Sequence, residues 1–272
     1  MIYRLEGVSK VYRQGHARVR ALGGVTLDVA PGEHVALLGQ SGAGKSTLFR
    51  LLNGTIRPTT GRVAFEGRDV GALSGADVRA MRRRIGTIYQ QHNLVPSLTA
   101  LENTLCGALG RWSLGRTLLS MVRPRQDDVA LALDALRRVG LTDQRQARAD
   151  ELSGGQQQRV AIARVLMQDP EVILADEPVA SLDPGLADEI IALLTRIAAD
   201  GKRTLVVALH AVDLALQHFP RVVALRGGSV AFDAPSAEIT SEQVRTLYAT
   251  NTTPATLGAH GSALKLKCDT AG

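Results

Sequence analysis

The spacing of apolar and polar positions divides the chain into two mixed stretches of strands and helices with a helical stretch between them. Short apolar or alternating runs bounded by turn residues predict strands, and amphipathic segments with helical spacing predict helices. Strand signals stop near residue 91 and resume at residue 172, whereas 99–167 is helical with almost no strand signal. The expected strands cover residues 2–8, 25–29, 33–38, 61–66, 85–89, 172–175, 204–209, 222–225 and 229–232.

Capping residues mark the ends of several expected helices. Ser74 precedes a helix with Asp77 in its first turn and arginines 82–84 in its last, which suits the helix dipole. Thr99 and Glu102 have the spacing of a capping box at the start of the helical stretch. Further helices are expected at residues 47–52, 127–139, 152–167, 188–199, 211–219 and 241–248.

The composition permits a sizeable core that is mainly aliphatic. Hydrophobic residues make up 45% of the 272 residues, but only 4 Phe, 4 Tyr and 1 Trp are present. Cys106 and Cys268 lie far apart, in no metal-binding or redox spacing, and we expect reduced thiols. No stretch approaches the roughly 18 apolar residues of a membrane span, and no N-terminal signal is visible. We expect a soluble or peripheral protein whose residues 249–272 form a disordered tail.

The charge balance is basic and favours anionic partners without choosing between them. Lys and Arg number 32 against 26 Asp and Glu, a net charge of +6. Nucleotides, nucleic acids and membrane surfaces all fit such a balance, and so does a solvated basic face. Aromatic residues do not interleave with the arginines as a platform for single-stranded nucleic acid requires.

A glycine-rich loop at residues 39–46 has the pattern G-x-x-x-x-G-K-S of a phosphate-binding loop. The apolar run 35–38 precedes it as a strand, and 47–52 follows it as a helix, which is the context that the motif needs. Backbone N–H groups would cradle phosphates, Lys45 would reach the β- and γ-phosphates, and Ser46 would bind Mg²⁺. The alternative is a plain glycine turn before a helix. The residues expected at the nucleotide are Gly39, Gln40, Ser41, Gly42, Ala43, Gly44, Lys45, Ser46 and Thr47.

Polar side chains follow several expected strands, at the sheet edge where α/β proteins bind ligands. Asp176 would hold Mg²⁺, and Glu177 would orient or deprotonate an attacking water. Gln90 could touch both the metal and the water, and His210 could donate to the γ-phosphate. A single His or Gln at a strand end more often makes an ordinary hydrogen bond, but several such ends together favour a catalytic site.

A second anion site is predicted at the start of the helix after Leu152. Ser153, Gly154, Gly155 and Gln156 offer a hydroxyl and free N–H groups at a helix N-terminus. One nucleotide cannot easily use two such sites in one chain, whereas a second copy turned head to tail could supply one to the other.

Two features remain open on the sequence alone. Tyr12 could stack on an adenine ring, although its spacing alone does not favour this. The segment 111–123 combines the only Trp with three arginines. It could contact a partner or an interfacial surface, but a helix packed on its own subdomain is favoured.

Together, these motifs resemble the ATP-binding subunit of an ABC transporter over about residues 2–248. The resemblance implies an α/β P-loop NTPase with a RecA-like core at 1–95 and 170–248. It also implies an antiparallel β subdomain and an inserted α-helical subdomain at about 96–169. The resemblance assigns the family's motifs to positions in this chain. These are Walker A at 39–46, the Q-loop at Gln90, the signature at 152–156, Walker B at 172–176, the catalytic glutamate at Glu177, the D-loop at 181–183 with Asp183, the switch histidine at His210 and the adenine-stacking aromatic at Tyr12.

Within that family the chain is most similar to the ATPase subunits of phosphonate importers, through residues 89–95, 101–105, 107–110, 111–123, 152–182 and 209–213. Ala43 and Ala211 are small departures from the family pattern. The resemblance implies a chain at the cytoplasmic face of the inner membrane that dimerises head to tail around ATP and Mg²⁺. It further implies two transmembrane permease subunits as partners and, indirectly, an extracytoplasmic solute-binding protein.

Three alternatives stay open. The cargo could be phosphite, methionine or an amino acid, because an ATPase subunit never touches the solute. A soluble ABC-type ATPase acting on nucleic acid has only the basic charge in its favour, so no nucleic acid partner is expected. The signature and His210 argue against a small-molecule P-loop kinase.

Overall fold

The computed structural model describes residues 1–15 and 17–249 of the chain. Its strands are β1 (Tyr3–Gln14), β2 (Ala17–Val29), β3 (His34–Leu38), β4 (Thr60–Phe65), β5 (Arg68–Asp69), β6 (Ile85–Ile88), β7 (Val172–Asp176), β8 (Thr204–Leu209), β9 (Arg221–Arg226) and β10 (Ser229–Pro235). Its α-helices are α1 (Lys45–Leu52), α2 (Gly75–Arg83), α3 (Ala100–Leu105), α4 (Leu114–Val122), α5 (Gln126–Arg138), α6 (Gly154–Gln168), α7 (Pro184–Asp200), α8 (Val212–His218) and α9 (Ser241–Tyr248). Short 3₁₀ helices are η1 (Val70–Ala72), η2 (Cys106–Arg111), η3 (Ala149–Glu151) and η4 (Ser236–Glu238). The tail predicted for 249–272 lies, apart from Ala249, outside the described residues.

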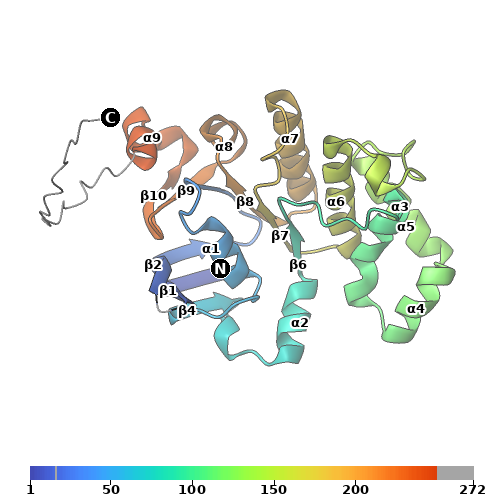
Figure 1. Ribbon diagram of the computed structural model, residues 1–272, viewed down its shortest axis with the longest axis horizontal. Helices are drawn as coiled ribbons and strands as arrows, with labels where there is room; N and C mark the ends of the chain where they lie inside the picture. Colours follow the sequence, from blue (N-terminus) through green and yellow to red (C-terminus); the bar gives the residue numbers. More distant parts are fainter. Residues whose placement is uncertain (16, 250–272) are drawn as a thin grey trace, which may run out of the picture.

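The larger sheet brings the strands that precede the candidate site side by side. Its order is β10-β9-β3-β8-β7-β6, parallel except for β10 at one edge. Leu38 pairs with Leu209, and Asp176 pairs with Ala208. The carboxyl ends of β3, β8 and β7 therefore meet at one edge. The smaller sheet, β2-β1-β4-β5, is antiparallel and lies beside α1 (Figure 1).

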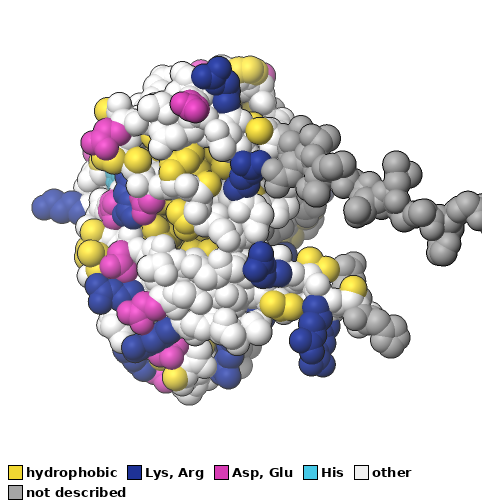
Figure 2. Space-filling model, turned by 90° about the vertical axis from the view of Figure 1, so that its left-hand side faces the viewer, with side chains coloured by type: hydrophobic (Ala, Val, Ile, Leu, Met, Phe, Trp, Pro, Cys, Tyr) yellow, Lys and Arg dark blue, Asp and Glu magenta, His cyan; other side chains and the backbone are white. Residues whose placement is uncertain are grey.

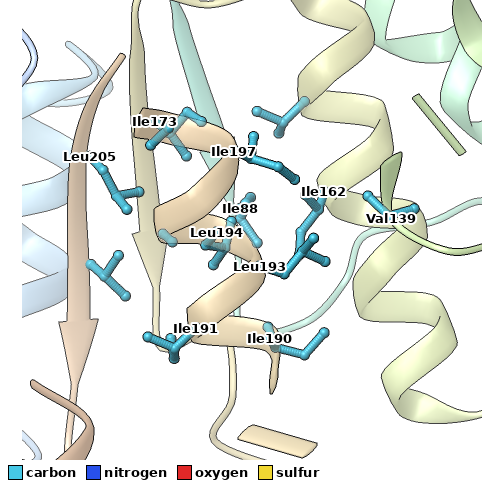
Figure 3. Packing of buried hydrophobic residues seen from close by; sticks show 14 of the residues in the cluster. Ile88, Val139, Ile162, Ile173, Ile190, Ile191, Leu193, Leu194, Ile197 and Leu205 are labelled. Atoms are coloured by element: carbon cyan, nitrogen blue, oxygen red, sulfur yellow. The ribbon is translucent and has the colours of Figure 1, made fainter. Parts of the chain in front are cut away.

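Both faces of the larger sheet are buried, because its central strands are apolar throughout. Side chains alternate between the faces, so that Ile173 of β7 joins one hydrophobic cluster and Leu174 joins the other. The first cluster includes α6, α7 and α8, and Figure 3 shows leucines and isoleucines of α7 between the strands and α6. The second cluster packs α1 and the smaller sheet against the opposite face.

The hairpin of β1 and β2 is longer than the sequence pattern predicted. In place of short strands at 2–8 and 25–29, the structure has paired strands of 12 and 13 residues. Their register shifts between Leu5 and Val8, and again on either side of Lys10. Gly7 and Gly24 adopt positive φ angles of 56° and 70°. Such bulges interrupt the alternation of side chains, which is why the apolar pattern ended too early.

The helices α3 to α6 come between β6 and β7 in the chain and lie together on the right in Figure 1. The predicted capping box of Thr99 and Glu102 is formed. In the segment 111–123, the ring of Trp112 packs on a small cluster of Ala108, Ala132 and Met167. The Arg116 guanidinium lies 4.9 Å from that ring and pairs with Asp128. These contacts support the interpretation that the segment packs on its own subdomain.

On the face of the molecule drawn in Figure 2, Lys and Arg mix with Asp and Glu along the left-hand edge, and separate basic side chains stand on the right. The net positive charge is thus not gathered into a single basic patch on that face. Within residues 1–15 and 17–249, no helix combines the length and the apolar character that crossing a membrane requires.

Candidate nucleotide-binding site

The loop between β3 and α1 is shaped by glycines that lie too close to other backbone for a side chain. Gly39 and Gly44 have φ angles of 155° and 106°. A Cβ on Gly39 would lie 2.5 Å from the carbonyl oxygen of Leu225, and one on Gly44 would lie 2.6 Å from that of Ala21. The loop therefore requires glycine at both positions.

Neighbouring turns hold the loop through main-chain hydrogen bonds. Gly228 N donates to Ala43 O at 3.1 Å, and Gly23 N donates to Gly228 O at 2.8 Å. Ala43 N also donates back to Gln40 O at 3.1 Å. The turn between β9 and β10, together with β2, thus fixes the loop from outside.

The first turn of α1 is free to bind an anion. Gly44 is its N-cap, no side chain caps the helix, and its first turn carries no acidic residue. The leading N–H groups of a helix lack partners within the helix, and the helix dipole makes that end positive. Phosphate groups bind at such ends.

Lys45 points back into the loop and is buried. Its Nζ lies 2.7 Å from Gly39 O and 3.3 Å from Gln40 O, and only 3% of its side chain is exposed. The same ammonium lies 3.3 Å from Glu177 Oε1. Burial lowers the pKa of Lys45, and the Glu177 carboxylate opposes that shift. A buried cation inside the loop matches the charge of a bound phosphate.

Two adjacent carboxylates stand at the end of β7. Ser46 Oγ lies 3.3 Å from Asp176 Oδ1, and His210 Nε2 lies 2.7 Å from Glu177 Oε1. Burial is the main cause that raises the pKa of Asp176 above its usual range. Glu177 has a φ of 52°. This left-handed conformation ends the extended course of β7 directly after Asp176.

The pairing of Ser46 with Asp176 fits a divalent cation. Hydroxyl and carboxylate oxygens are the ligands that Mg²⁺ prefers. A cation there would also favour the charged form of the desolvated Asp176 carboxylate. Within the described part of the chain, no group of three or more His, Cys, Asp or Glu side chains could hold a metal ion by itself, so phosphates, water or the predicted ligand Gln90 would have to supply the remaining ligands.

Two predicted site residues are not joined to this group. Gln90 follows β6 after Tyr89, is exposed, and has no hydrogen bond to any described residue. Tyr12 lies on β1 opposite Val19 of β2, with the Lys10 ammonium 5.4 Å from its ring centroid. The structure thus assembles Lys45, Ser46, Asp176, Glu177 and His210, while the roles of Gln90 and Tyr12 remain predictions.

The segment 153–156 caps α6 and packs against the start of α7. Ser153 and Gln156 exchange capping hydrogen bonds of 2.9 Å and 3.3 Å. A Cβ on Gly155 would lie 2.4 Å from Leu186 Cδ2, so the absence of a side chain allows the two helices to approach. Asp183 caps α7 by accepting from Leu186 N at 3.0 Å. Within the described chain, no hydrogen bond links this segment to the phosphate loop.

One supporting residue escaped the sequence reasoning. Arg164 of α6 donates to Asn93 O at 2.6 Å and to His92 O at 2.9 Å, and so holds the backbone just after Gln90. Burial lowers the pKa of this guanidinium. An arginine within the apolar run of α6 is the only signal in the sequence, and it does not indicate which backbone the side chain would reach.

A glycine loop at an open helix N-terminus, with a buried lysine inside it and carboxylates at the next strand end, defines a P-loop nucleoside triphosphatase. A family profile described as "ABC transporter" matches residues 22–180. The chain belongs to the ABC transporter family.

Several known proteins are similar to this chain over most of its length. It is 49% identical over 249 residues to phosphonates import ATP-binding protein PhnC 1 of Pseudomonas aeruginosa, covering 92% of this chain and 91% of that protein. It is 42% identical over 245 residues to PhnC of Lactococcus lactis subsp. cremoris, covering 90% and 98%. The dimeric structure of MJ0796, a bacterial ABC transporter cassette, has a TM-score of 0.76 and 32% identity, covering 86% of this chain and 98% of that one. The predicted α/β P-loop fold is confirmed.

Proposed function

We propose that this chain is the ATP-hydrolysing subunit of a phosphonate importer and works at the cytoplasmic face of the inner membrane. The carrying observation is that one Glu177 oxygen lies within contact distance of both the Lys45 ammonium and His210 Nε2. The names of the 40–50% identical relatives support phosphonate as the cargo.

The phosphate groups of ATP bind in the loop of residues 39–46, and their charge is met by Lys45 and the start of α1. Ser46 and Asp176 would hold Mg²⁺, which would supply positive charge against the bound phosphates. Gln90 would complete the metal site, and Tyr12 would stack on the adenine. These two roles rest on the family pattern.

Glu177 accepts a proton from the attacking water, or orients that water, at the end of β7. His210 contacts the same Glu177 oxygen. It would donate a hydrogen bond toward the γ-phosphate. In the ATP-bound state, the phosphate competes with Glu177 for the Lys45 ammonium. This competition frees the Glu177 carboxylate to act on water.

Two chains close around two ATP molecules. Ser153, Gly155 and their neighbours contribute the second half of each site in the partner chain. Among the described residues, no hydrogen bond joins the start of α6 to the phosphate loop of the same chain. This agrees with a role of that segment at the nucleotide of the partner chain. The dimeric form of a similar cassette supports the same arrangement.

The permease subunits dock in a groove between the phosphate-loop core and the inserted helices. The groove has a volume of 580 Å³, includes Tyr89 in its lining, and has no acidic residue among the described residues that line it. It includes the arginines Arg79, Arg82, Arg83, Arg111 and Arg164. Since Gln90 follows Tyr89 directly, movement on ATP binding reaches this groove. The solute-binding protein acts through the permease, and no nucleic acid is involved.

Growth of the host tests the cargo. The chain is deleted, and growth is measured with a phosphonate, phosphite or inorganic phosphate as the sole phosphorus source. We expect loss of growth on phosphonate alone, restored by the wild-type chain but not by Glu177→Gln. Loss of growth on phosphite alone would show that phosphite, and not a phosphonate, is the cargo. Normal growth on all three, in a host without a second importer, would contradict the importer function.

A further inference from the structure

Tyr248, the last residue of α9, touches two parts of the nucleotide site that are far apart in the chain. Its hydroxyl donates to the main-chain oxygen of His210 at 2.9 Å. Its own main-chain oxygen accepts a hydrogen bond from Gln40 Nε2, also at 2.9 Å. Gln40 is the second residue of the phosphate loop, so one residue joins that loop to the segment that carries the histidine.

The position of Tyr248 is set by the fold. The helix α9 starts with a capping box of Thr240 and Gln243, and its Leu247 is 2% exposed. The Tyr248 ring packs on the main hydrophobic cluster, and Arg226 Nη2 donates to Ala249 O at 3.1 Å. Burial raises the pKa of Tyr248, so its hydroxyl remains protonated and able to donate at neutral pH.

His210 depends on such support because it sits on a short connection. It follows β8, and α8 begins only at Val212. Its side chain is 41% exposed, so packing alone does not hold the ring against Glu177. Rotation of the His210 peptide would carry the imidazole away from the Glu177 oxygen. The hydrogen bond from Tyr248 restrains that peptide.

We propose that Tyr248 is a positioning residue for ATP hydrolysis, which holds His210 through its hydroxyl and the phosphate loop through its main-chain oxygen. This inference rests on the ATPase part of the proposed function. Tyr248 touches neither the phosphates nor the water. It keeps the loop and the histidine in one fixed arrangement, so that Glu177 and His210 meet the γ-phosphate together.

The test compares Tyr248→Phe with Tyr3→Phe by steady-state ATP hydrolysis on the full chain. Tyr3 is fully buried, and its hydroxyl has no hydrogen-bond partner among the described residues. Both variants lose one hydroxyl from a packed ring, but only Tyr248 contacts the site. We expect Tyr248→Phe to lower kcat about fivefold, the size of one hydrogen bond, with KM for ATP within about twofold of wild type. Tyr3→Phe should leave both unchanged.

A second readout separates positioning from general stability. Because Tyr248 acts through His210, Tyr248→Phe should lower kcat no further in a His210→Ala background. An unchanged kcat in Tyr248→Phe, or a loss that persists without the His210 imidazole, overturns the inference. A fall in Tm with a parallel fall in ATP affinity overturns it also. If the wild-type chain itself hydrolyses no ATP, the proposed function fails and the inference fails with it.

Discussion

Lys45 and Glu177 form an ion pair of 3.3 Å in which the lysine side chain is only 3% exposed. The two residues are far apart in the sequence and meet because β3 and β7 flank β8 in the sheet. This pair places the cation that we expect at the phosphates next to the carboxylate that we propose acts on water.

Replacing Glu177 by Gln keeps the shape of the side chain and removes its charge. We expect ATP binding to persist while turnover falls about 10²- to 10⁴-fold, the usual contribution of a general base. Phosphate release measures turnover, and a fluorescent ATP analogue measures binding. Full turnover in this variant would refute the role of Glu177.

Replacing Lys45 by Ala removes the buried cation from the loop. We expect ATP affinity to fall roughly 10- to 100-fold, since hydrogen bonds to charged groups contribute about 1.5–3 kcal/mol. Equilibrium titration measures the change. Lys202→Ala, at an exposed turn after α7, is the control and should leave affinity unchanged. Equal ATP affinity in both variants would contradict a role for Lys45 in binding the phosphates.

Replacing Gly155 by Ala forces a Cβ against Leu186 at 2.4 Å. Since the Leu186 side chain is flexible and half-buried, it can give way in part, and we expect the free energy of unfolding to fall by about 1 kcal/mol at most. Urea denaturation measures it. A second change, Leu186→Ala, should restore part of the loss by making room. If Leu186→Ala restored no stability, the contact with Leu186 would not be the cause of the loss.

Asp176 predicts a pH dependence of stability. Burial raises the pKa of Asp176 above its ordinary value of 3.8, so between 3.8 and the raised pKa the folded state holds a proton that the unfolded state has lost. Stability therefore decreases as the pH rises from about 3.8 through the raised pKa. Asp176→Asn removes this penalty. Measured by urea denaturation without Mg²⁺, the variant should be more stable than wild type at pH 7, with the advantage shrinking toward pH 4. An advantage independent of pH would contradict the assignment.

The sequence predicted most of the large sheet and the phosphate loop because their signals are local. The apolar runs of β3, β7 and β8 and the glycine pattern of 39–46 need no knowledge of distant contacts. The grouping of Gln90, Asp176, Glu177 and His210 beside the phosphate loop followed from the rule that ligands bind at strand carboxyl ends. The structure brings Asp176, Glu177 and His210 together with Lys45 and Ser46 of the loop, whereas Gln90 is not joined to them.

Other features depend on contacts that no local pattern encodes. The bulges at Gly7 and Gly24 hid the length of the hairpin, and α7 starts at Pro184 because Asp183 caps it, which places the start four residues before the expected position at 188. The contact of Gly155 with Leu186 and the bridge from Tyr248 to Gln40 join segments that are distant in the chain. Their partners become visible only once the chain is folded.

The place of β3 in the sheet has a consequence for synthesis on the ribosome. Both neighbours of β3, the strands β8 and β9, are made long after it, and Gly228, which hydrogen-bonds to the loop, follows later still. A nascent chain that has already exposed the whole glycine motif still lacks the strands and the turn that hold it. The capacity to bind ATP therefore arises only after β8, β9 and the turn at Gly228 have been made, and a chain released before that point cannot compete for the nucleotide.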